Sequence, residues 1–241
     1  MISKNDIKFI RSLSQKKFRD EYGLFIVEGE KLVKEALESD FDIESVYYSS
    51  EIGEEAMSRI SMLSSPSPAM AIIKMPKETS NEKIKNIIDK KPLALALESL
   101  SNPGNVGTII RIADWFGIDA IFASYDTVDI FNPKVVQATM GAIFRNKFIY
   151  TDLITISELF NLAEMPVYGT FLEGDTIYSK DLELSGLIIM GSESNGISEE
   201  LETKVTRKLY IPSYPVGVKT SESLNVAIAT SIVCSEFRRN C

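Results

Sequence analysis

Three polar segments of the chain each follow a short apolar run, and their residues are candidates for ligand binding. The first is NPGNVGTIIR at residues 102–111, where Pro103 and Gly104 predict a tight turn and Asn105 is placed to cap the following helix. Its glycine spacing differs from the dinucleotide-binding GxGxxG fingerprint and from the phosphate-binding Walker loop. Taken alone, the segment is equally consistent with an ordinary strand–turn–helix junction.

The other two segments have a similar arrangement nearer the C-terminus. In LIIMGSESNG, Gly191 follows the apolar run directly, so a ligand could lie against bare backbone, and Glu193 supplies an acid. In the last segment Ile211 ends an apolar run, and Ser223 and Asn225 introduce a final helix for which both are candidate caps. Considered separately, each segment is also explained by structure alone, with Glu193 holding loop N–H groups and Ser223 capping the helix.

The absence of histidine from the 241 residues limits the acid–base chemistry available to these segments. A Ser–His–Asp relay and an imidazole–zinc site are both excluded. The two cysteines, Cys234 and Cys241, have neither a metal-ligand nor a disulfide-framework spacing, which fits a reducing compartment and predicts no metal site. No apolar run approaches the roughly 18 residues that span a bilayer, so we expect a cytoplasmic protein without a membrane partner.

Charge is unevenly distributed along the chain. The 26 Lys and Arg residues against 34 Asp and Glu residues give a net charge of −8, which argues mildly against nucleic acid as a partner. Residues 1–19, however, contain six basic residues and one aspartate. Because phosphate contacts are local, Lys16, Lys17 and Arg19 are candidate RNA contacts on an otherwise acidic protein. The alternative is a solvated helix face without a partner.

The pattern of apolar runs predicts the elements that position these residues. In the first part of the chain, helical spacing alternates with short strand-like runs, which predicts a small α/β unit that ends near residues 80–91. Beyond Pro92, apolar runs alternate with helical segments, which predicts a parallel sheet covered on both faces, with ligands beyond the carboxyl ends of its strands. These runs lie at residues 93–97, 120–123, 167–171, 187–190 and 209–211.

Together and in this order, the three segments resemble the motifs of the SpoU family of RNA ribose 2′-O-methyltransferases, in the SPOUT superfamily. NPGNVGTIIR, MGSESNG and IP followed by SLNV match these motifs closely, and FIVEGEKLVKEAL at residues 25–37 is similar to the family's N-terminal domain. The resemblance covers the whole chain. It implies an RNA substrate-binding domain at residues 1–88 and a SPOUT-type catalytic domain at residues 92–241.

The resemblance further implies a deep C-terminal trefoil knot and an obligate homodimer whose sites are completed near the interface. The helix at residues 225–239 has a broad apolar face and is the candidate dimer surface, with packing inside the core of its own chain as the alternative. It implies S-adenosylmethionine as cofactor, contacted by Thr170, Gly191, Ile211 and Leu224. The catalytic set implied by the motifs is Asn105, Arg111, Glu193, Ser223 and Asn225. Residues 213–220, SYPVGVKT, depart from the family pattern, which leaves the shape of the cofactor pocket open.

In the family pattern Arg111 activates the ribose hydroxyl, either as the base or through the adjacent RNA phosphate. Because a guanidinium group stays protonated, we favour a role in which Arg111 grips this phosphate and lowers the hydroxyl pKa electrostatically. The phosphate or Glu193 then receives the proton.

Other interpretations lead to different functions. The two-domain layout favours ribosomal RNA as substrate by analogy, with transfer RNA as the alternative. A non-catalytic RNA-binding protein of the same fold would be expected to lack motif residues, all of which are present here. A nucleotide-dependent oxidoreductase would need the GxGxxG fingerprint, which this chain lacks.

Overall fold

The computed structural model describes the chain except residues 1, 78, 179–181, 216, 217, 219, 220, 240 and 241. The protein forms two compact units, each considered by itself. The first comprises Met1–Lys77 and Asp129–Arg145, and the second comprises Glu78–Val128 and Asn146–Cys241.

The first unit contains a three-stranded antiparallel sheet in the order β1-β3-β2, which confirms the small α/β unit predicted from the sequence. Its core joins α1 and α5 to β1 and β3 through buried side chains such as Ile10, Ile26, Met57 and Ile72. The helix α2 was not predicted. The elements are α1 (Lys4–Ser12), α2 (Lys16–Tyr22), β1 (Leu24–Glu28), α3 (Glu30–Leu37), β2 (Ile43–Tyr48), α4 (Ser49–Ile52), α5 (Glu54–Ile60), β3 (Ala69–Lys74), α8 (Pro133–Thr139) and the 3-10 turn η1 (Ala142–Phe144).

A segment distant in sequence, residues 129–145, packs within this first unit. The Phe131 ring lies 4.7 Å from that of Phe25 on β1, and the Arg145 guanidinium pairs with Glu35 on α3 at 2.6 Å. The predicted domain boundaries follow the order of the chain and assign this segment to residues 92–241. The packing assigns it to the first unit, whereas the division into functional domains at 1–88 and 92–241 stays a prediction.

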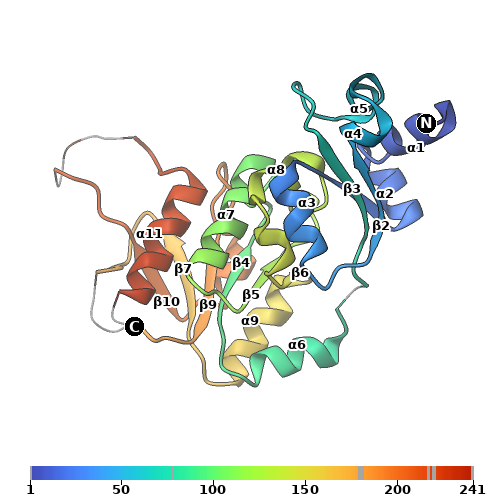
Figure 1. The fold of residues 1–241 in the computed structure, drawn as a ribbon. Coiled ribbons are helices and arrows are strands. Elements are labelled where there is room, and N and C mark those ends of the chain that lie inside the picture. The colour runs from blue at the N-terminus through green and yellow to red at the C-terminus, as the bar shows by residue number, and fades with distance from the viewer. Residues whose placement is uncertain (1, 78, 179–181, 216–217, 219–220, 240–241) are drawn as a thin grey trace. The chain divides into compact units, whose positions relative to one another are not determined.

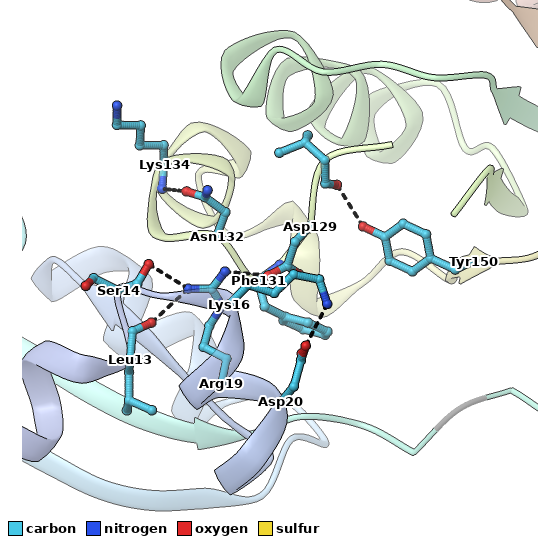
Figure 2. A network of polar contacts seen from close by, with 11 residues as sticks. Leu13, Ser14, Lys16, Arg19, Asp20, Asp129, Phe131, Asn132, Lys134 and Tyr150 are labelled. Carbon is cyan, nitrogen blue, oxygen red and sulfur yellow. Dashed lines mark hydrogen bonds and ion pairs between the residues drawn. The ribbon is translucent and has the colours of Figure 1, made fainter. Parts of the chain in front are cut away.

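Arg19 holds α2 and this segment together, as Figure 2 shows. Its side chain is only 2% exposed. Nη1 donates to the carbonyl oxygens of Leu13 and Ser14 at 2.9 and 2.8 Å, and Nε and Nη2 donate to Asp129 Oδ2 at 3.1 and 2.5 Å. Asp129 Oδ1 in turn accepts from the Phe131 N–H at 2.9 Å. The prediction of Arg19 as an RNA contact is therefore wrong, because its guanidinium is buried and already bonded within the protein.

The second unit is built on a seven-stranded, wholly parallel sheet in the order β6-β5-β4-β9-β7-β10-β8. All five apolar runs predicted as strands lie in this sheet, and β6 and β8 were not predicted. The elements are α6 (Asn81–Ile88), β4 (Leu93–Leu97), α7 (Pro103–Trp115), β5 (Ala120–Ala123), β6 (Phe148–Tyr150), α9 (Leu153–Leu162), β7 (Val167–Phe171), β8 (Asp175–Thr176), β9 (Gly186–Met190), α10 (Glu199–Glu202), β10 (Arg207–Tyr210) and α11 (Val226–Arg238).

Helices cover both faces of this sheet, as expected for parallel strands. One core joins α6, α9 and α10 to strand side chains such as Ala94, Phe122 and Val167. On the opposite face the next residue of β7, Tyr168, meets Phe237 of α11 with ring centroids 4.9 Å apart. α7 and α11 lie side by side (Figure 1). Across the described part of the chain, no helix has the length and hydropathy needed to cross a membrane.

We predict that Arg19→Met lowers the free energy of unfolding by about 3–5 kcal/mol, because it leaves the Asp129 carboxylate buried without its partner. The matched control is Lys16→Met, which breaks the exposed pair of Lys16 with Asp20 and should cost about 1 kcal/mol or less. Urea unfolding followed by circular dichroism measures both. Equal small losses in the two variants would show that Arg19 does not hold α2.

Candidate active site

The three polar segments meet at the carboxyl edge of the parallel sheet. β4 and β9 are hydrogen-bonded neighbours, with Leu97 opposite Met190, so the first two segments start side by side. β10 ends at Tyr210, and the third segment leads from there to α11. Parallel strands all end at one edge of a sheet, and this is where the pattern of apolar runs predicted a binding site.

Asn102, and not Asn105, caps α7. Its Oδ1 accepts from the N–H groups of Gly104 at 2.8 Å and Asn105 at 3.2 Å. The prediction of Asn105 as the cap is wrong because the helix begins earlier, with Pro103 in its first position. An asparagine directly before proline is itself a helix-start signal that was overlooked. The Asn105 side chain is left free for other contacts.

Asn105 links the other two segments. Its Nδ2 donates to Glu193 Oε1 at 2.5 Å, and its Oδ1 accepts from Asn225 Nδ2 at 3.1 Å. Asn225 caps α11, because its Oδ1 accepts from the N–H groups of Ala227 and Ile228 at 3.0 and 3.3 Å. Each amide is therefore oriented by its neighbour, and the series ends with the Glu193 carboxylate as acceptor. We call Glu193, Asn105 and Asn225 the amide relay.

Ser223 does not cap the last helix. It precedes α11 by three residues, is exposed, and leaves the capping position to Asn225. Of the two caps predicted for this helix, Asn225 is confirmed and Ser223 is wrong, since the helix starts too late for Ser223 to reach its first turn. Ser223 instead lines a cavity beside the amide relay.

This cavity has a volume of about 870 Å³, within the usual range for small-molecule sites. Glu193 and Ser223 both line it. Its lining also includes all the residues predicted to contact a cofactor, namely Thr170, Gly191, Ile211 and Leu224. The residues selected from the sequence therefore surround one cavity in the fold, although Thr170 and Leu224 are 54 positions apart in the chain.

Gly191 is required by the loop as well as by the cavity. Ser192 and Gly196 exchange two backbone hydrogen bonds of 3.0 Å, which closes a tight turn. A Cβ atom on Gly191 would overlap the backbone of Gly196 and Ile197. The Thr170 hydroxyl donates to the Ile189 carbonyl at 3.0 Å, so its oxygen can still accept a hydrogen bond.

A further carboxylate that the sequence analysis did not select joins the end of β4 to the chain that follows the second segment. Glu98, directly after β4, accepts from the Ser198 N–H at 2.9 Å beyond the turn that follows β9.

Arg111 does not line the cavity of its own chain. It lies on an exposed stripe of α7 together with Thr108 and Trp115, and Trp115 is 84% exposed. The spacing of six residues from Asn105 places the two side chains on different sides of the helix. Among the described residues, the structure thus brings together four of the five predicted catalytic residues, with Arg111 apart from them.

Lys16 and Lys17 lie in the first unit, exposed on α2. Lys16 pairs with Asp20 at 2.8 Å, and Lys17 Nζ lies 5.8 Å from the centre of the Phe18 ring. Both lysines are accessible to a polyanion, unlike Arg19.

Neither thiol nor metal chemistry is indicated among the described residues. Burial raises the pKa of Cys234 to about 12, so this thiol stays neutral at physiological pH. Cys241 lies outside the described residues, as do four positions of the divergent segment 213–220. Within the described parts of the chain, no group of His, Cys, Asp and Glu side chains could hold a metal ion.

Comparison with known proteins agrees with this geometry. The B. subtilis 23S rRNA (guanosine(2553)-2′-O)-methyltransferase RlmP is 29% identical, with 96% of this chain and 95% of the relative covered. The solved structure of a TrmH-family protein from Porphyromonas gingivalis is 36% identical, with a TM-score of 0.88 and both chains wholly covered. The AdoMet-bound rRNA methyltransferase from Sinorhizobium meliloti is 29% identical, with a TM-score of 0.87 and 99% and 97% covered.

Two family models together match most of the chain. That of the MRM3-like substrate binding domain matches residues 4–87. That of the SpoU rRNA Methylase family matches residues 92–235, which include the amide relay, Arg111 and the cavity. The chain therefore belongs to the SpoU rRNA methylase family.

Proposed function

We propose that this protein transfers a methyl group from S-adenosylmethionine to a ribose 2′-hydroxyl of ribosomal RNA. The observation that carries the proposal is the amide relay, which joins the three motif segments beside a cavity lined by every predicted cofactor contact. Membership of the SpoU rRNA methylase family and the names of the relatives support it. Those names favour ribosomal over transfer RNA.

The cavity suits S-adenosylmethionine in size and chemistry. Apolar side chains of Met190, Ile211 and Leu224 fit an adenine ring, and the Glu193 carboxylate favours the positive charge of a sulfonium group. When bound, the cofactor supplies an electrophilic methyl group. The protein's own contribution is to hold two reactants in line, which alone can supply a large part of a rate enhancement.

The ribose hydroxyl must also lose its proton, and the chain has no histidine to take it. We propose that the Arg111 guanidinium binds the phosphate beside the target ribose and lowers the pKa of the hydroxyl through its positive charge. The proton passes to this phosphate or to Glu193, whose Oε1 already accepts the Asn105 amide. Asn105 and Glu193 would hold the motif loops and the ribose edge, and Ser223 lines the cavity beside them.

A homodimer would explain the position of Arg111. The apolar face of α11 is divided: Val226, Val233 and Phe237 are buried within their own unit, whereas Ile228 is 55% exposed. α7 packs beside α11 and presents Trp115 and Arg111 outward. We infer that this exposed surface of α7 and α11 pairs with a second copy and brings Arg111 of one copy to the cavity of the other.

Three further features belong to the same proposal. The C-terminal segment passes through a loop to form a trefoil knot, the protein acts in the cytoplasm, and residues 1–88 bind the RNA through contacts that include Lys16 and Lys17. The match of residues 4–87 to a substrate binding domain and the exposure of both lysines support the last of these.

Arg111→Lys should lower the rate of methyl transfer to ribosomal RNA about a hundredfold, because lysine cannot form the bidentate phosphate contact. Cofactor affinity, measured by calorimetry, should stay unchanged, since Arg111 lies outside its own cavity. Transfer of labelled methyl groups to ribosomal RNA that lacks the modification measures the rate. Full activity of this variant would refute the role given to Arg111.

The same reaction tests the dimer. Arg111→Ala and Asn105→Ala chains should each be inactive, yet a mixture should regain activity, because one site of the mixed dimer has both residues intact. A mixture as inactive as its components would place Arg111 with the cavity of its own chain.

Asn225→Asp distinguishes the two roles of this side chain, namely capping α11 through Oδ1 and donating to Asn105 through Nδ2. Aspartate caps a helix as well as asparagine, so unfolding should change by less than about 0.5 kcal/mol. The variant loses the amide donor to Asn105, and the rate should fall about ten- to a hundredfold. Asn225→Ala is the control that loses the cap as well. A wild-type rate in Asn225→Asp would show that the relay has no role in catalysis.

A further inference from the structure

Aromatic rings and basic side chains are interleaved on α1 and α2 of the first unit. Phe18 and Tyr22, one helical turn apart, are stacked with ring centroids 6.4 Å apart and an interplanar angle of 11°. Phe9, from α1, and Tyr22 form an edge-to-face pair with ring centroids 5.1 Å apart and an interplanar angle of 70°. Lys17 Nζ lies over Phe18, 5.8 Å from its centroid. We call Phe9, Lys17, Phe18 and Tyr22 the aromatic–basic surface.

One side of the aromatic–basic surface packs against the core of the first unit, and the other side is exposed to solvent. Phe9 packs against the core of the first unit, and Phe9 and Phe18 are each half-buried. Tyr22, by contrast, keeps 46% of its surface exposed. An aromatic ring held in place on one side and exposed on the other is suited to stack against a planar ligand.

Charge on the same helices favours an anionic ligand. Lys4, Lys8 and Arg11 are exposed at helical spacing along α1, and Lys16 and Lys17 are exposed on α2. The acids on these helices are Asp6, Asp20 and Glu21; Asp6 is bonded in the α1 capping box, and Asp20 pairs with Lys16. Among the described residues of α1 and α2, five exposed cations therefore stand against three exposed acids.

Arg19 fixes the aromatic–basic surface before any ligand arrives. α2 has seven residues and no side-chain cap at its N-terminus, and so short a helix is unstable alone. The buried Arg19–Asp129 pair, visible in Figure 2, holds it in place. Arg19 thus acts as a positioning residue for its neighbours Lys17, Phe18 and Tyr22, and a pre-positioned surface loses little entropy on binding.

We infer that the aromatic–basic surface binds an unpaired stretch of the substrate RNA, with a base stacked on Tyr22 and phosphates contacted by Lys17. Base faces are hidden within a duplex, whereas loops and single strands expose them to aromatic side chains. A duplex offers phosphates but no exposed base faces, so cations alone would be enough to bind it and the exposed rings would add nothing. This inference rests on the proposed function and specifies the form of RNA that the first unit recognises.

The test compares affinities of the full-length protein for a short fluorescein-labelled oligoadenylate, single-stranded or annealed to oligouridylate, by fluorescence anisotropy. Tyr22→Leu keeps apolar volume but removes the ring, and should weaken single-strand binding about 5- to 100-fold while leaving duplex binding unchanged. Tyr22→Phe should restore wild-type affinity. Lys17→Met should reduce the salt dependence of single-strand binding by about 0.7 in its logarithmic slope.

Tyr48→Leu is the matched control, because Tyr48 is also a partly exposed tyrosine of the first unit, at 36%. It should leave both affinities unchanged, and circular dichroism verifies that each variant folds. Equal single-strand affinity for Tyr22→Leu and wild type, or equal losses on both RNAs, would overturn the inference. Methyl transfer by the wild-type protein is measured in parallel, so a failure of the proposed function is recognised separately from a failure of the aromatic–basic surface.

Discussion

Asn225 cannot cap α11 without turning its amide nitrogen away from the helix and toward Asn105. The cap uses Oδ1, which leaves Nδ2 to donate to Asn105 Oδ1, and Asn105 must then present its own Nδ2 to Glu193. One helix start thereby fixes the orientation of two further side chains from two other segments. The parallel pairing of β4 with β9 makes this possible, because it places the start of α7, which carries Asn105, next to the loop that carries Glu193. The cavity and its proposed chemistry depend on that constraint.

In the first unit, basic side chains have two different roles. The unit buries one cation, Arg19, against Asp129, which joins a segment more than a hundred residues away to α2. The remaining cations of α1 and α2 stay exposed on the same helices that carry a group of aromatic rings. The same short basic stretch of sequence therefore contains both a structural cation and candidate RNA contacts, and only burial separates the two roles.

The sequence predicted the fold class well because buried parallel strands appear as continuous apolar runs, such as LALAL in β4 and GLIIM in β9. It could not separate Arg19 from Lys16 and Lys17, since the partner that buries Arg19 is distant in the chain. The caps were misplaced for a related reason. Asn102 and Asn105 both suit a helix start, as do Ser223 and Asn225, and only the exact first turn decides between them. The four cofactor positions came from motif resemblance, and their gathering around one cavity depends on strand order, which no local pattern contains.

The most direct test is to map 2′-O-methylated nucleotides in ribosomal and transfer RNA from cells with and without the gene. The account predicts that one ribosomal 2′-O-methyl group is lost with the gene and returns when the wild-type chain is expressed. An unchanged map in every RNA, or a loss confined to transfer RNA, would contradict it.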